Sequence, residues 1–108
     1  MNHAVSISLC SLVLMTGCVT VSVMPSGNSV ATMPKAENCT IEFFRTTKPD
    51  RPYVEIGTIS AEGSRDTPPA TEQESIRKKA CELGADAVIV TRESAPQNGM
   101  IGVAIKYK

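Results

Sequence analysis

Apolar and polar residues alternate over three stretches between residue 39 and the end of the chain. In residues 53–59 and 101–107, and in residues 39–45 as far as Phe43, apolar side chains recur at alternate positions, which is typical of strands with one buried face. The apolar side of 53–59 changes phase near Gly57, which indicates a β-bulge or a close backbone approach. Residues 87–90, AVIV, are apolar throughout, as in a strand buried on at least part of both faces. The pattern therefore predicts four strands.

A helical period lies between the second and third predicted strands. Apolar residues recur at i, i+4 and i+7 from Ile76, so they share one face of a helix. Thr71, followed three residues later by Glu74, has the pattern of a capping box at a helix start. Gly84 is suited to end the helix in a left-handed conformation. We therefore expect a helix from Thr71 to Leu83.

The predicted order is ββαββ. The second and third strands, joined through the helix, should be parallel with a right-handed crossover, while the outer connections can be hairpins. One helix covers only one face of a four-stranded sheet, so residues 39–108 should form a two-layer α+β sandwich. A core of this size is marginal, and we expect support from a disulfide or from a partner on the uncovered sheet face.

Charged residues are confined to the part of the chain from Lys35 onward, where eleven basic residues balance eleven acidic ones. There is no net positive field to attract phosphate backbones, so we expect no nucleic-acid partner. The single histidine, His3, precedes the first apolar run. If that run is removed, no imidazole remains for nucleophilic catalysis or for metal binding. We therefore expect a protein that is not an enzyme and has no cofactor.

The N-terminus has the pattern of a targeting segment. Residues 4–15, AVSISLCSLVLM, match the length of a signal-peptide core and are too short to span a bilayer. The following residues, with Gly17 directly before Cys18, resemble the lipobox of bacterial lipoproteins. This resemblance implies that residues 1–17 are removed and that Cys18 carries lipid. The alternative is an ordinary secretory peptide with an incidental cysteine.

The lipobox resemblance also implies a location. Stable anchoring follows when Cys18 carries two or three acyl chains. Val19 follows the cysteine, and by resemblance to sorting in enteric bacteria the absence of Asp at this position favours the outer membrane. We therefore expect a lipid-anchored protein of the outer membrane that faces the periplasm or the surface.

Residues 19–38 are rich in Ser, Thr, Val, Pro and Gly and show no helical period. As a flexible tether after Cys18 they would span about 25 Å. The alternative is that Val19 to Met24 form an extra edge strand, because VTVSV alternates.

Two cysteines remain within the predicted domain. In an oxidising compartment Cys39 and Cys81 can form a disulfide. Cys81 lies at the edge of the apolar stripe of the predicted helix. The disulfide therefore requires the first predicted strand, which begins at Cys39, to run beneath that side of the helix. The alternatives are two buried free thiols, or a soft-metal site that adds Met24, Met33 or Met100, for which no CxxC or MxxM spacing is present.

Three short segments suggest a family. IGTIS at 56–60, GADAVI at 84–89 and IGVAI at 101–105 resemble the folded domain of RcsF, an outer-membrane lipoprotein group that reports envelope damage to a phosphorelay. The passage into GADAV is also similar to the YbjQ group, small proteins described as heavy-metal binders. RcsF-type domains carry two disulfides whose cysteines are absent here, so the resemblance does not extend to redox sensing.

These observations predict a non-enzymatic envelope lipoprotein that binds another envelope protein or senses envelope damage. The expected contact surface is the strand face bearing Ile101, Val103, Ile105 and Tyr107, or the opposite face. The alternative is a periplasmic protein that binds a metal or a small ligand.

Overall fold

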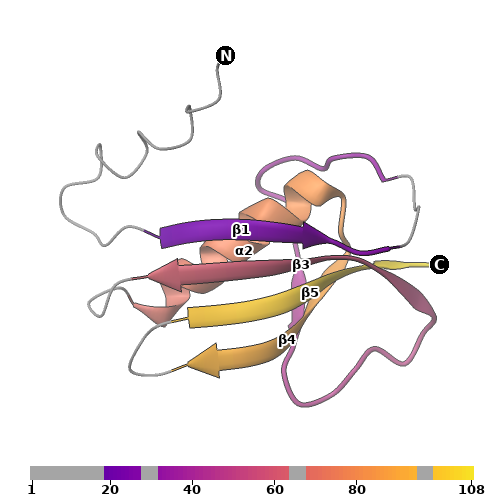
Figure 1. Ribbon diagram of the computed structural model, residues 1–108. Helices are drawn as coiled ribbons and strands as arrows, with labels where there is room; N and C mark the ends of the chain where they lie inside the picture. The colour runs from indigo at the N-terminus through magenta and orange to yellow at the C-terminus, as the bar shows by residue number, and fades with distance from the viewer. Residues whose placement is uncertain (1–18, 28–31, 64–67, 95–98) are drawn as a thin grey trace.

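The computed structural model describes residues 19–27, 32–63, 68–94 and 99–108. The predicted signal peptide and Cys18 lie outside the described residues. The described chain forms five strands and one helix (Figure 1). The elements are β1 (Val19–Pro25), β2 (Glu42–Phe44), β3 (Tyr53–Gly63), α2 (Pro69–Leu83), β4 (Ala87–Ser94) and β5 (Gly99–Tyr107).

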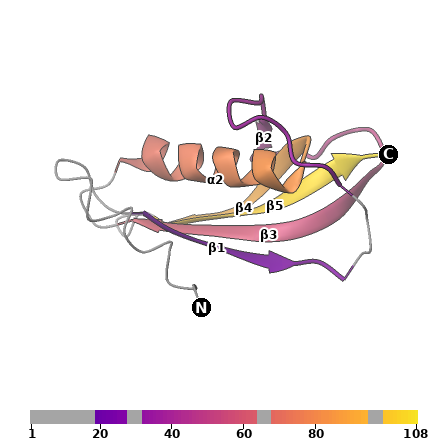
Figure 2. The same ribbon diagram turned by 90° about the horizontal axis from the view of Figure 1, so that it is seen from above.

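The strands form one mixed sheet in the order β1-β3-β5-β4-β2. Only the pairing of β2 with β4 is parallel, and the other neighbouring strands are antiparallel. Helix α2 lies against one face of the sheet (Figure 2). The α+β class is therefore confirmed, as is one helix within the described residues, whereas the prediction of four strands was wrong by one. The connection between β2 and β3 is not a hairpin, because β2 lies at the opposite edge of the sheet, beside β4.

The additional strand comes from the predicted tether. β1 pairs with β3 from Val19 opposite Gly63 to Pro25 opposite Gly57. The valines at alternate positions of β1 pack against the core, while Thr20 and Ser22 between them are exposed. The alternation of apolar and polar residues therefore suits β1 to pair at the edge of the sheet with one face buried. The prediction of a flexible tether was therefore wrong for Val19–Pro25.

The later part of the same segment is also packed against the domain. The backbone N–H of Lys35 donates to the carbonyl of Cys81 at 2.8 Å. The Lys35 ammonium lies 2.6 Å from Oδ1 of Asp86. Residues around Lys35 therefore cross the C-terminal end of α2, where the sequence predicted free chain.

Helix α2 begins two residues earlier than expected. Pro68 is the N-cap and Pro69 opens the first turn, where the fixed φ of proline suits a helix and its missing N–H is no loss. Thr71 lies inside the helix, and its carbonyl accepts a bond from the hydroxyl of Ser75. Glu74 pairs instead with Arg77, so the predicted capping box was wrong. Gly84 ends the helix with φ of 82°, as predicted.

The core lies between α2 and the sheet. It combines one stripe of the helix with alternate residues of β3, β4 and β5, as the apolar periods predict. Its fully or almost fully buried members include Ile59, Ala61, Ile76, Ala80, Val88, Val90, Met100 and Ala104.

A disulfide joins Cys39 to Cys81. Their Cα atoms are 5.9 Å apart, because the segment before β2 runs along the flank of α2 that carries Cys81. Arg77 holds this segment as well, since its Nη1 donates to the carbonyls of Glu37 at 3.0 Å and Cys39 at 2.8 Å. Both sulfurs are bonded to each other, so this structure offers neither free thiols nor a thiolate pair for metal at this position.

Candidate functional site

The sheet face opposite α2 carries a row of side chains that crosses all five strands. The register aligns Met24, Thr58, Val103, Ile89 and Phe44, one from each strand. Residues directly opposite each other project from the same side of a sheet, and this side is opposite the one packed against α2. Four of the five are apolar, and we call the five residues the apolar row.

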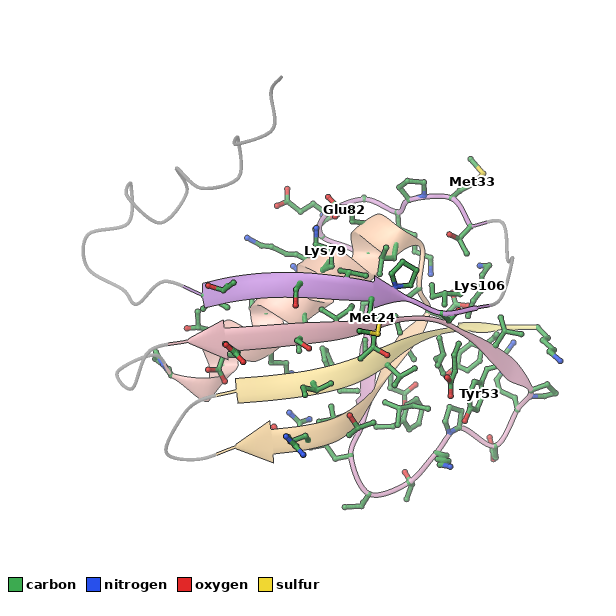
Figure 3. The ribbon with its side chains drawn as sticks, in the orientation of Figure 1. Met24, Met33, Tyr53, Lys79, Glu82 and Lys106 are labelled. Atoms are coloured by element: carbon green, nitrogen blue, oxygen red, sulfur yellow. A yellow bond between two sulfur atoms is a disulfide. The ribbon has the colours of Figure 1, made fainter. Side chains whose placement is uncertain are left out.

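The apolar row is accessible. Met24 is 72% exposed, and the other four side chains are half-buried. In Figure 1, where α2 lies behind the sheet, this face is turned toward the viewer, and Figure 3 shows Met24 in front of the ribbon. No helix in the described part of the chain covers it. The row therefore offers a mainly apolar contact across the width of the sheet, interrupted only by Thr58 on β3.

A second, more polar row lies beside the apolar row. It consists of Ser22, Ser60, Ile101 and Arg92, aligned across β1, β3, β5 and β4. A register shift at Thr91 brings Arg92 opposite Ile101. The hydroxyl of Thr91 donates to the carbonyl of Ile101 at 3.2 Å. This bulge therefore places an exposed guanidinium beside the apolar row.

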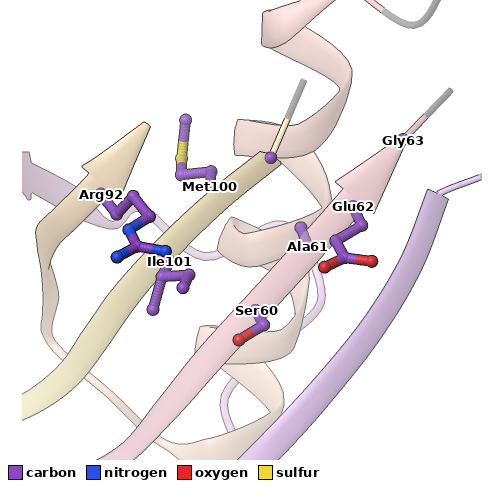
Figure 4. Close-up of a pocket in the computed structure, with 8 residues that line it drawn as sticks. Ser60, Ala61, Glu62, Gly63, Arg92, Met100 and Ile101 are labelled. Carbon is purple, nitrogen blue, oxygen red and sulfur yellow. The ribbon is translucent and has the colours of Figure 1, made fainter. Parts of the chain in front are cut away.

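A shallow pocket of 270 Å³ lies at the end of the sheet where β3 and β4 finish (Figure 4). Exposed side chains of opposite charge, Glu62 and Arg92, line it together with Ser60 and Ile101. Sites for drug-sized ligands are usually about 300–1,000 Å³ and largely enclosed. The pocket is thus better suited to part of a surface contact than to an enclosed small molecule.

The four residues predicted to form a contact face all project from the side opposite α2, but they are not equally accessible. Ile101 and Val103 are half-buried and adjoin or belong to the apolar row. Ile105 is fully buried, so its proposed contact role was wrong. Tyr107 is half-buried, and the guanidinium of Arg51 lies 4.0 Å from the centre of its ring. Met24, which the sequence suggested only as a metal ligand or edge-strand residue, contributes more exposed surface.

Asp86 has a structural role that the sequence did not reveal. Its Oδ2 accepts the backbone N–H of Tyr107 at 2.8 Å, and its Oδ1 meets Lys35. Burial favours a higher pKa for this carboxyl, but the bonds from Lys35 and Tyr107 outweigh it and lower the pKa. Asp86 therefore stays ionised and ties the segment around Lys35 to the end of β5.

Glu72 is a buried acid within the first turns of α2. Its side chain is 2% exposed, and its Oε2 has no hydrogen-bond partner among the described residues. Burial raises its pKa, the backbone N–H of Gly63 opposes that shift, and the charge of Glu93 adds to it. The ionised form is thus an energetic cost to the fold at neutral pH.

Replacing Glu72 by Gln should raise the free energy of unfolding at pH 7 by about 1 kcal/mol, because it removes a buried charge and keeps an acceptor for the backbone N–H of Gly63. A raised pKa means that the folded state favours the protonated carboxyl. The cost is therefore absent below the ordinary value of 4.5 and grows as pH rises through the folded pKa. Urea unfolding should show the gain at pH 7 and its disappearance on acidification.

The matched control is Glu82→Gln, which removes an exposed carboxylate paired with Lys79 on the same helix. This variant should change stability by less than about 0.5 kcal/mol. A Glu72→Gln protein less stable than the wild type at pH 7 would show that the buried carboxylate is favourably paired.

No family model, curated protein or solved structure matches this chain. Among the described residues, no helix is long and apolar enough to cross a membrane. The same residues contain no group of three or more His, Cys, Asp or Glu side chains arranged to hold a metal.

Proposed function

We propose that this protein is a non-enzymatic, RcsF-like lipoprotein of the bacterial outer membrane, anchored through Cys18, that binds another envelope protein through the apolar row. The observation that carries the contact is the alignment of Met24, Val103, Ile89 and Phe44 on the sheet face that α2 leaves uncovered.

The disulfide supports an envelope location. Disulfides persist in oxidising compartments and are rare in the reducing cytosol. The Cys39–Cys81 bond closes a separation of 42 residues around a small core, where it contributes to stability. An exported protein would form this bond, which agrees with the predicted signal peptide, residues 1–17.

The composition of the face supports a protein partner. Protein interfaces combine an apolar centre, often with Met and aromatic residues, and a polar rim that contains Arg. Here the apolar row includes Met24 and Phe44, and the neighbouring row includes Ser60 and Arg92. The alternative of a periplasmic metal binder has less support, because Cys39 and Cys81 are bonded to each other.

Cys18→Ala should abolish both incorporation of a palmitate analogue and sedimentation with the outer-membrane fraction, because the acyl chains are the proposed anchor. Metabolic labelling followed by membrane fractionation measures both. Cys10→Ala, which alters a cysteine inside the predicted signal peptide, is the control and should leave labelling unchanged. Labelling of the Cys18→Ala protein, or an unmodified wild type that begins at Met1, would contradict the anchor.

A photo-crosslinking amino acid at Val103 should give a discrete crosslinked protein in intact cells, because Val103 is central in the apolar row. The same group at Glu82, exposed on α2, is the matched control. Met24→Glu should remove the Val103 product, since it places a charge in the apolar contact. A product of equal yield from Glu82, or one from Val103 that survives Met24→Glu, would contradict binding at this face.

A further inference from the structure

The distance between the proposed anchor and the folded domain is much shorter than the sequence indicates. Val19 is the residue directly after Cys18, and it already pairs with Gly63 as the first residue of β1. Consecutive Cα atoms are about 3.8 Å apart. An acylated Cys18 would thus stand one residue from the sheet, whereas the predicted tether allowed about 25 Å.

The anchor is attached at a defined end of the domain. At this end β1 and β5 begin, β3 and β4 finish, and α2 starts, as Figure 1 shows. Tyr53, Tyr107 and Lys108 lie at the opposite end. The nine residues of β5 separate the two ends by about 27 Å at the usual rise of a strand. With a single anchor next to Val19, the end of the domain at which β1 begins is close to the lipid and the opposite end is far from it.

We propose that, in the acylated protein, the end bearing Val19, Gly63 and Gly99 lies against the phospholipid headgroups and the end bearing Tyr107 and Lys108 points away from them. This inference rests on the proposed anchor at Cys18 and adds the orientation of the domain. The pocket lies at the lipid-facing end, with Glu62 and Arg92 at its rim. Side chains of both signs suit a zwitterionic headgroup, which carries a phosphate and an ammonium group.

The charges at the far end largely balance, so they do not set the orientation. This end carries the cations Arg51, Lys106 and Lys108, but it also carries the acids Asp50 and Asp86, and the Lys106 ammonium lies 3.9 Å from Oδ2 of Asp86. Close opposite charges leave little net charge for an anionic membrane surface to attract. Phosphatidylcholine vesicles, which carry no net charge, isolate the contribution of the anchor.

Tryptophan fluorescence tests the orientation, because the chain contains no tryptophan. Ala70→Trp places a probe near the start of α2, at the lipid-facing end, and Lys108→Trp places one at the far end. Both residues are exposed. The full-length acylated protein is purified from membranes, its acyl mass is checked by mass spectrometry, and it is reconstituted into phosphatidylcholine vesicles with a nitroxide on the headgroup.

Emission of the Ala70→Trp protein should be quenched at least about twofold more strongly than that of Lys108→Trp, since the far probe stands about 27 Å further along the sheet. Equal quenching, or stronger quenching of Lys108→Trp, in protein that sediments with the vesicles overturns the orientation and leaves the anchor intact. Protein that carries no acyl mass and stays in the supernatant overturns the anchor, and the orientation with it. Cys18→Ala with either probe should show no quenching in these vesicles.

Discussion

Replacing both Cys39 and Cys81 by alanine should lower the free energy of unfolding by about 4 kcal/mol, because the bond closes a separation of 42 residues in the unfolded chain. Small domains have a total stability of about 5–15 kcal/mol, so this loss would bring the domain close to unfolding. Urea unfolding followed by far-UV circular dichroism measures the change, since the chain offers no tryptophan signal.

Reduction of the wild type provides the control for the alanine substitutions themselves. A thiol reductant should destabilise the wild type by a similar amount and should leave the double variant unchanged. In the wild type Arg77 also bonds the carbonyls of Glu37 and Cys39. We expect these backbone contacts to persist in the variant and to keep some of the order of this segment. A loss below about 1 kcal/mol in both experiments would show that these contacts, rather than the bond, hold the segment against α2.

Gly84→Ala should lower the free energy of unfolding by about 2–3 kcal/mol, for two reasons that act together. Gly84 has φ of 82°, which a residue with a Cβ adopts only with strain. A Cβ at this position would also stand 2.5 Å from the carbonyl oxygen of Met33, so the backbone there would have to move. That backbone is held nearby by the bond from Lys35 to Cys81. Thermal and urea unfolding measure the loss.

Gly27→Ala is the matched control. Its φ lies outside the left-handed region, and a Cβ there would meet no atom within 4 Å. The variant should differ from the wild type by less than about 0.5 kcal/mol. If Gly27→Ala were as destabilising as Gly84→Ala, the effect would not come from the helix end and its contact with Met33.

The local pattern of apolar and polar residues predicted where the strands and the helix lie better than it predicted which strands pair with each other. The alternation in β3 and β5 and the apolar run in β4 identified strands because each buries alternate side chains against α2 or its neighbours. β1 alternates equally well, but composition and its place after Cys18 favoured a tether. Val19 of β1 pairs with Gly63 of β3, which lies far from it in the sequence. The alternation of apolar residues within each strand does not indicate which other strand it pairs with. The parallel pairing of β2 with β4 was missed for the same reason.

The candidate contact surface was only partly predictable, because the residues that share it depend on the register in which the five strands pair. The sequence placed Ile101, Val103, Ile105 and Tyr107 on one side of a strand, but it could not show that Ile105 would be fully buried. The apolar row also requires Met24 to be part of the sheet. The phase change near Gly57 indicated the bulge in β3, whereas no signal in the sequence marked the shift at Thr91 that positions Arg92.

The start of β1 directly after Cys18 has a mechanical consequence. A pull between an acylated Cys18 and a partner bound on the sheet face would act along β1. The seven residue pairs between β1 and β3 would then be loaded in shear. Bonds loaded in shear share the force and break together, whereas bonds peeled from one end break in succession. The first strand of the domain would serve as a stiff coupling between the membrane and the bound protein.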